Sequence, residues 1–148
     1  MRLVIDTNVL ISALFSSTSL PTHLIELWRQ GLFDLLTSTD QLDELMRVTR
    51  YPDGCSPGTS VEIRDRLTPA LAGRLINELR DPAIVLKDLP AVTVSPDPWD
   101  NYLLATAAAG AADFLVTGDK RDLLPLGCYG GAKIVTVRDF LALIRRLT

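Results

Sequence analysis

The chain has 148 residues, of which 47% are hydrophobic and 22% charged, so it fits one folded, soluble domain over residues 1–148 and not a disordered chain. Its formal net charge of -3 argues mildly against a protein that binds nucleic acid without specificity. No apolar run reaches the roughly 20 residues that span a bilayer, and the first apolar stretch is too short for a secretory signal, so we expect a cytoplasmic protein with no membrane partner.

The first third of the sequence alternates between strand and helix patterns. Apolar residues at helical spacing follow a short apolar run at the start of the chain. Pro21 and Gly31 stand where a second helix would begin and end. Ser38 and Gln41 form the pattern of a capping box, and the helix that they open stops before Pro52. This predicts a strand at 2–5, helices at 7–15 and 21–31, a strand at 32–36 and a helix from 38 to about 50.

Turn-rich and apolar segments divide the rest of the chain. Residues 53–60 are rich in Gly, Pro and Ser, which is typical of a loop. Pro69 either starts a new helix within the helical segment 61–80 or kinks that helix. We expect further strands at 91–94, 114–117 and 133–137 and helices at 98–109 and 138–147. Because strands alternate with helices, the sequence predicts an α/β fold with a central parallel sheet of about five strands.

Three acidic residues occupy places where a parallel sheet would bring their side chains together. Asp6 follows the first strand, Asp119 follows the strand at 114–117, and Asp100 lies at a helix start. Carboxylates crowded at the carboxyl edge of such a sheet repel one another unless a proton or a cation intervenes. A divalent metal held by carboxylates indicates phosphate chemistry. Taken singly, each acid also fits an ordinary helix cap.

Three further acids have weaker claims to this site. Glu44 lies away from the apolar stripe of its helix, which on physical grounds predicts a solvated side chain. Asp97 is interpreted as a helix cap with a supporting role. Asp122 is three residues past Asp119 and could join the acidic cluster on one side of a helical turn.

Residues for other kinds of catalysis are missing from the sequence. His23 is the only histidine, and it lies in a helix well away from the acids. Cys55 and Cys128 have no Cys or His at metal-ligand spacing. No serine or cysteine triad and no phosphate-binding glycine loop can be built. If the chain is an enzyme, carboxylates and a metal must carry the chemistry.

Four segments together resemble the PIN domain family. They are Val4 to Phe15 with Asp6-Thr7-Asn8, Leu42-Asp43-Glu44-Leu45, Asp97-Pro98-Trp99-Asp100-Asn101, and Leu115 to Leu124 with Thr117-Gly118-Asp119. The resemblance covers nearly the whole chain. It is to the small single-domain PIN toxins of toxin–antitoxin pairs, the VapC type, and the first and last segments are specific as a pair.

The resemblance implies a three-layer α/β/α fold and an endoribonuclease that depends on Mg²⁺ or Mn²⁺. It implies that the catalytic and metal-binding acids are Asp6, Glu44, Asp100 and Asp119, with Asp122 as a further metal-binding position. It also implies supporting roles for Thr7, Asn8, Asp97 and Thr117. For Glu44 the motif and the apolar stripe disagree, and we follow the motif. The implied partners are an RNA substrate, an antitoxin protein and a second copy in a homodimer.

Other functions stay open at the level of sequence. A PIN nuclease can serve housekeeping RNA processing, and a PIN scaffold can bind RNA without cutting it. A receiver-like signalling domain also gathers acids, a Thr and a Lys at one sheet edge. Such a domain needs paired acids after its first strand and an Asp after a middle strand, whereas this chain has Asp6 alone and no acid at Leu36-Thr37. The four acids of the PIN pattern favour a catalytic protein.

Overall fold

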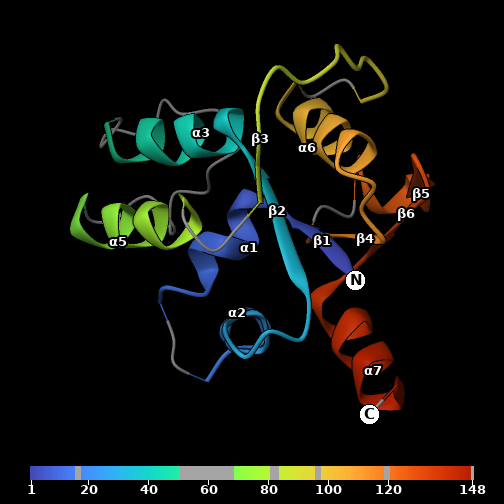
Figure 1. Ribbon diagram of the computed structural model, residues 1–148, viewed down its shortest axis with the longest axis horizontal. Helices are drawn as coiled ribbons and strands as arrows, with labels where there is room; N and C mark the ends of the chain where they lie inside the picture. The colour runs from blue at the N-terminus through green and yellow to red at the C-terminus, as the bar shows by residue number, and fades with distance from the viewer. Residues whose placement is uncertain (16–17, 51–68, 81–83, 96–97, 119–120, 148) are drawn as a thin grey trace.

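A central sheet organises the computed structural model, which describes residues 1–15, 18–50, 69–80, 84–95, 98–118 and 121–147 (Figure 1). Its strands are β1 (Arg2–Ile5), β2 (Asp34–Ser38), β3 (Ile84–Leu86), β4 (Phe114–Val116), β5 (Cys128–Tyr129) and β6 (Ala132–Val135). The order across the sheet is β3-β2-β1-β4-β6-β5, and all neighbours run parallel except β5 and β6. The predicted α/β fold with a mostly parallel sheet is confirmed, with 6 strands in place of about five.

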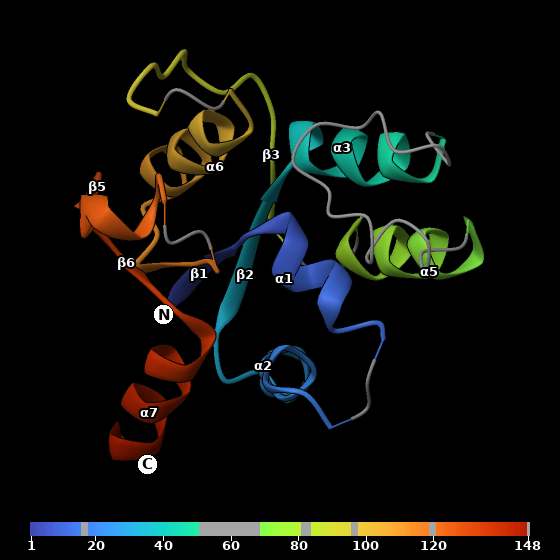
Figure 2. The same cartoon turned by 180° about the vertical axis from the view of Figure 1, so that it is seen from behind.

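Helices cover both faces of the sheet, as the opposite views in Figures 1 and 2 show. One face carries α1 (Thr7–Ser12), α2 (Leu20–Arg29), α3 (Thr39–Arg50), α5 (Pro69–Arg80) and α7 (Val137–Leu147). The other carries α6 (Pro98–Ala109) and the short 3-10 helix η1 (Leu124–Leu126). Successive side chains of β1 point to opposite faces of the sheet. Leu3 and Ile5 pack with the first group of helices, and Val4 packs with α6. The predicted three-layer arrangement is therefore confirmed.

The carboxyl ends of β1 and β4 lie side by side where the order of the strands reverses. The chain places β2 and β3 on one side of β1, and β4, β6 and β5 on the other. The Asp6 N–H donates to Val116 O at 2.9 Å, and the Thr117 N–H donates to Val135 O at 3.0 Å. Open parallel sheets bind ligands in the crevice at such a switch point. The fold thus places Asp6 and Thr117 where a ligand site is expected.

The predicted strand at 91–94 is wrong, and the third strand of the sheet is β3. β3 is an edge strand that pairs with β2, and its Ile84 is 39% exposed. β3 is itself an apolar run, Ile84-Val85-Leu86, so the sequence offers two neighbouring apolar segments for one strand. Val94, by contrast, is an apolar residue that is 48% exposed and lies outside the strands. Apolar character alone therefore does not decide between the two segments.

Other strand predictions differ from the structure in their limits. β2 begins and ends two residues later than the predicted 32–36. The last predicted strand, 133–137, ends at Val135 because Thr136 caps α7, its hydroxyl oxygen accepting from the Asp139 N–H at 3.1 Å. The two-residue β5 was not predicted, since so short a segment carries no periodic signal.

The helices follow the predictions with shorter or shifted ends. α1 stops at Ser12 instead of residue 15. Ser38 caps α3 as predicted, its hydroxyl oxygen accepting from the Gln41 N–H at 3.1 Å, but the Gln41 side chain turns away to other partners. α5 begins at Pro69, so this proline starts a helix. The predicted loop at 53–60 and the helical segment before residue 69 lie outside the described residues. In the described part of the chain, none of the helices combines the length and apolarity that a bilayer crossing requires.

Candidate active site

Asp6 is the first residue after β1, and both of its carboxylate oxygens accept a hydrogen bond. Oδ1 accepts from the Asn8 N–H at 3.2 Å and so caps α1, and Oδ2 accepts from the Thr117 hydroxyl at 2.7 Å. Asp6 is only 8% exposed. The cap that sequence alone suggested is real, and it acts together with Thr117 to fix the direction of the carboxylate.

Glu44 is buried, so the solvated position predicted from its helix stripe is wrong. It is 5% exposed and lies where α3 meets α1 and α6. Its Oε2 accepts hydrogen bonds from the Thr7 hydroxyl, at 2.9 Å, and from the Tyr102 hydroxyl. The apolar stripe of α3 gives only the apolar contacts of that helix. The polar side of α3, which carries Glu44, is buried as well, because Glu44 contacts Thr7 of α1.

The pKa of Glu44 is raised from 4.5 to about 7, chiefly by burial and to a smaller extent by the Asp6 carboxylate, against the hydrogen bonds from Tyr102 and Thr7 and the charge of Arg47. The Thr7 and Tyr102 hydroxyls also contact each other at 2.8 Å, so these two oxygens and Glu44 Oε2 lie in mutual contact. Two hydroxyl protons can serve only two of these three contacts. A proton on Glu44 or a cation beside it would relieve this arrangement.

The sequence reasoning missed two residues that hold this cluster together. Gln41 Nε2 donates to Ile5 O at 2.7 Å and to the Thr7 hydroxyl at 3.3 Å, and so ties α3 to the end of β1. Tyr102 joins α6 to the same hydroxyl, and burial followed by the Glu44 charge raises the pKa of Tyr102 well above its usual value. The available signal for Tyr102 was a single phenol in a helix otherwise rich in Ala and Leu.

Asp100 lies in the first turn of α6 and is 6% exposed. Its Oδ2 accepts from the Ser95 hydroxyl at 3.1 Å. The Asn101 side chain forms two hydrogen bonds with the backbone of the same serine. Its Oδ1 accepts from the Ser95 N–H and its Nδ2 donates to Ser95 O, both at 2.8 Å. Ser95 thereby fixes the first turn of α6 to the chain before it, a role that the sequence did not reveal. Asp97, expected at this helix start, lies outside the described residues.

The remaining acid of the predicted set, Asp119, also lies outside the described residues, just past Gly118. Asp122 is half-buried in the turn before η1. Within the described ranges, no group of three or more His, Cys, Asp or Glu side chains is arranged to hold a metal ion, and that set lacks Asp119. The buried carboxyls that are described supply oxygen donors, which Mg²⁺ and Mn²⁺ prefer, and the raised pKa of Glu44 marks a site that a cation would stabilise.

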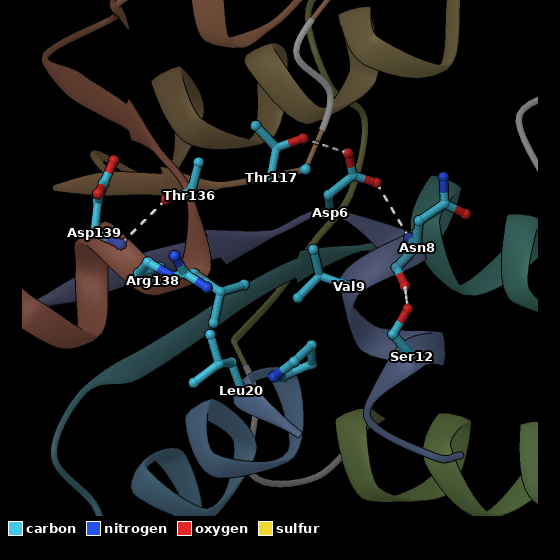
Figure 3. A pocket seen from close by; sticks show the side chains of 12 residues that line it. Asp6, Asn8, Val9, Ser12, Leu20, Thr117, Thr136, Arg138 and Asp139 are labelled. Atoms are coloured by element: carbon cyan, nitrogen blue, oxygen red, sulfur yellow. Dashed lines mark hydrogen bonds between the residues drawn. The ribbon is translucent and has the colours of Figure 1, made fainter. Parts of the chain in front are cut away.

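A pocket of about 710 Å³ opens beside Asp6, and Figure 3 shows this residue between Thr117 and Asn8 on the pocket wall. The wall includes residues of α1, the first turn of α2, the chain after β4 and the start of α7. Because Asp6 belongs to both, the pocket is continuous with the acidic site.

Replacing Tyr102 with Phe tests the polar cluster without changing the size of the buried ring. We expect Tyr102→Phe to lower the free energy of unfolding by about 1–3 kcal/mol, because Glu44 loses a donor. Urea unfolding at pH 8 measures the loss. Tyr129→Phe, at a half-buried tyrosine of β5, is the control and should stay within about 0.5 kcal/mol of the wild type. Equal stability of the two variants would contradict the role given to the Tyr102 hydroxyl.

Comparison with known proteins agrees with this architecture. A family model described as PIN domain matches residues 2–121. Among solved structures, the chain is similar to VapBC2 from Rickettsia felis bound to a DNA fragment from their promoter, with a TM-score of 0.56 and 12% sequence identity, over 92% of this chain and 98% of that one. At this identity the likeness shows the fold alone. A search of curated protein sequences finds no match.

Proposed function

Because the chain belongs to the PIN-domain family, whose members are generally nucleases, we propose that it is an endoribonuclease dependent on Mg²⁺ or Mn²⁺. The observation that carries the proposal is the pair of buried acids at the switch point of the sheet. Asp6 and Glu44 come from different elements, and burial, with a smaller effect from the charge of Asp6, raises the pKa of Glu44. Two buried carboxyls that repel each other are the environment that a hard divalent cation stabilises.

In this proposal the acids bind the metal, and the metal supplies the chemistry. By the family pattern, Asp6, Glu44, Asp100 and Asp119 would hold the cation, with Asp122 as a further ligand. When bound, the metal lowers the pKa of water and neutralises charge that builds up on the phosphate. His23 is exposed on α2, and the proposal requires no side-chain nucleophile.

The neighbouring polar residues orient the acids. The Thr117 hydroxyl and the Asn8 N–H fix both oxygens of Asp6, so its lone pairs keep one direction. Thr7 and Tyr102 do the same for one oxygen of Glu44. A site whose ligands are held in this way loses little entropy when the cation binds, because the rotamers are already set.

We propose single-stranded or looped RNA as the substrate, since unpaired strands expose their backbone to a surface crevice. We expect products with 5′-phosphate and 3′-hydroxyl ends and a cytoplasmic location. The likeness to VapBC2 supports a toxin–antitoxin role, with an antitoxin as partner and a homodimer as the assembly. A small gene directly upstream, whose product co-purifies with this chain and stops cleavage, would support that role. Full activity in the presence of that product would oppose it.

Metal dependence is tested with the protein stripped by EDTA and then supplied with Mg²⁺ or Mn²⁺. Cleavage of a labelled single-stranded RNA should stop with the chelator and return with either ion. The melting temperature should rise with the ion, because binding to the folded state adds RT ln(1 + [L]/Kd) of stability. RNA cleavage that persists in excess EDTA would refute the metal mechanism. An unchanged melting temperature at millimolar Mg²⁺ would count against a preformed site.

A further inference from the structure

The pocket beside Asp6 has the size and composition of a nucleotide site. Its volume of about 710 Å³ falls in the range of about 300–1,000 Å³ that is usual for small-molecule sites. One wall is apolar and includes Val9, Leu20 and Pro21, and Leu20 is 43% exposed. Such a wall offers a nucleobase a surface that excludes water.

Arg138 supplies a positive charge to the same pocket. It is exposed in the first turn of α7, an 11-residue helix, and it lines the pocket. In the part of the chain that the structure describes, its guanidinium forms no hydrogen bond or ion pair. In Figure 3 its side chain extends toward the middle of the pocket, while that of Asp139 turns the other way. A guanidinium in this position can bind a phosphate oxygen pair, and the helix N-terminus adds to the attraction.

We propose that this pocket binds the nucleotide next to the scissile phosphate of a single-stranded RNA, with Arg138 on that nucleotide's own phosphate. The inference rests on the proposed nuclease function, because it takes the scissile phosphate to lie at Asp6. Asp6 is on the pocket wall, so one strand can reach the acids and the pocket together. Arg138 offsets part of the repulsion that the nearby acids exert on an RNA backbone.

The matched variants for the test lie on one helix. Arg138→Ala removes the charge from the pocket, and Arg146→Ala removes the same charge from the last turn of α7, where the residue is exposed and outside the pocket lining. We expect Arg138→Ala to raise KM for RNA by about 10-fold with kcat nearly unchanged, since the contact is made equally in ground and transition states. Its salt slope for RNA binding should fall by about 0.7, the value for one single-strand phosphate contact. Arg146→Ala should match the wild type.

A second pair of variants tests the pocket through its apolar rim. Leu20 and Leu32 are 43% and 44% exposed, and only Leu20 lines the pocket. Leu20→Asp places a repelling charge beside the bound nucleotide and should raise KM, while Leu32→Asp should leave KM unchanged. Adenosine 5′-monophosphate should compete with RNA for the wild type and for Arg146→Ala, and more weakly for Arg138→Ala.

The outcomes separate this inference from the function on which it rests. If the wild type cleaves RNA and the Arg138 and Arg146 variants have equal KM and salt slope, the pocket inference is wrong and the nuclease proposal stands. If Arg138→Ala changes kcat alone, the inference is also wrong, because the residue then acts on the reaction itself. If Arg138→Ala weakens only the binding of a protein partner, the pocket belongs to that partner. Failure of the wild type to cut any RNA would overturn the function itself.

Discussion

Asp6→Asn is expected to reduce RNA cleavage by on the order of 10²–10³-fold, the scale of removing one group that stabilises charge in a transition state. Asn has the shape of Asp, and its carbonyl oxygen can still accept from the Asn8 N–H, as Oδ1 does now at 3.2 Å. Its amide can face the Thr117 hydroxyl, which then accepts where it now donates. The variant therefore loses the negative charge and keeps the cap, so the fold should persist while activity falls.

The control for this variant is Asp34→Asn. Asp34 is exposed at the first position of β2, so it lies at the opposite edge of the same sheet. Single-turnover cleavage, measured beside circular dichroism, should show loss of activity for Asp6→Asn and none for Asp34→Asn. Without metal, Asp6→Asn should even melt slightly higher than the wild type, because the charge of Asp6, which adds to burial in raising the pKa of Glu44, is gone. Wild-type cleavage by Asp6→Asn would remove this residue from the catalytic site.

The metal-free protein should lose stability as the pH rises from 4.5 to about 7, and Glu44→Gln should remove this loss. Burial raises the folded-state pKa of Glu44 to about 7 from an ordinary 4.5, so the folded state holds this proton more tightly than the unfolded state. The stability from this group is complete below pH 4.5 and is lost as the pH passes through about 7. At about 1.4 kcal/mol per unit, the shift corresponds to about 3 kcal/mol.

Urea unfolding in EDTA at pH 5 and pH 8 measures this effect. Glutamine can still accept from Thr7 and Tyr102, so the variant keeps the hydrogen bonds and lacks the titration. From pH 5 to pH 8 the wild type should therefore lose about 2–3 kcal/mol of stability relative to Glu44→Gln. Glu26→Gln, at an exposed position of α2, is the control and should follow the wild type at both. Parallel pH curves for wild type and Glu44→Gln would show that Glu44 ionises normally.

Magnesium should reverse the pH effect in the wild type. A divalent cation favours the ionised form of Glu44, so added Mg²⁺ should stabilise the protein more at pH 8 than at pH 5. The same addition should stabilise Glu44→Gln less, because the variant offers a neutral amide oxygen in place of a carboxylate. Equal stabilisation of both proteins by Mg²⁺ would show that the cation binds elsewhere.

The layers of the fold were predictable because each central strand is buried on both faces. β1 and β4 appear in the sequence as short, continuous apolar runs, and such runs between helical patterns indicate a parallel sheet. β3 was missed although Ile84-Val85-Leu86 is a comparable apolar run, so local apolarity did not separate the strand from its neighbouring segments. Its position depends on pairing with β2, which no local pattern encodes.

In the candidate site, too, the features set by local sequence were predictable and those set by distant contacts were not. Asp6 was predictable because it directly follows a buried strand, and strand ends converge in any parallel sheet. The burial of Glu44 was not, because it depends on Tyr102, which is 58 positions away in the chain and comes from another helix. Spacing within one helix says which residues share a face, and it does not say which neighbour that face will meet. The family pattern selected Glu44, whose burial the apolar stripe of its own helix did not predict.

The central place of β1 also bears on how the protein is made. Asp6 meets Thr117 across a separation of 111 positions, and β4, the second neighbour of β1, comes from the last third of the chain. While the ribosome is still adding the residues before β4, β1 stands at the open margin of an incomplete sheet and Asp6 has no hydroxyl to hold it. Unfinished copies therefore lack the assembled site, so the proposed activity would begin only when synthesis is nearly over.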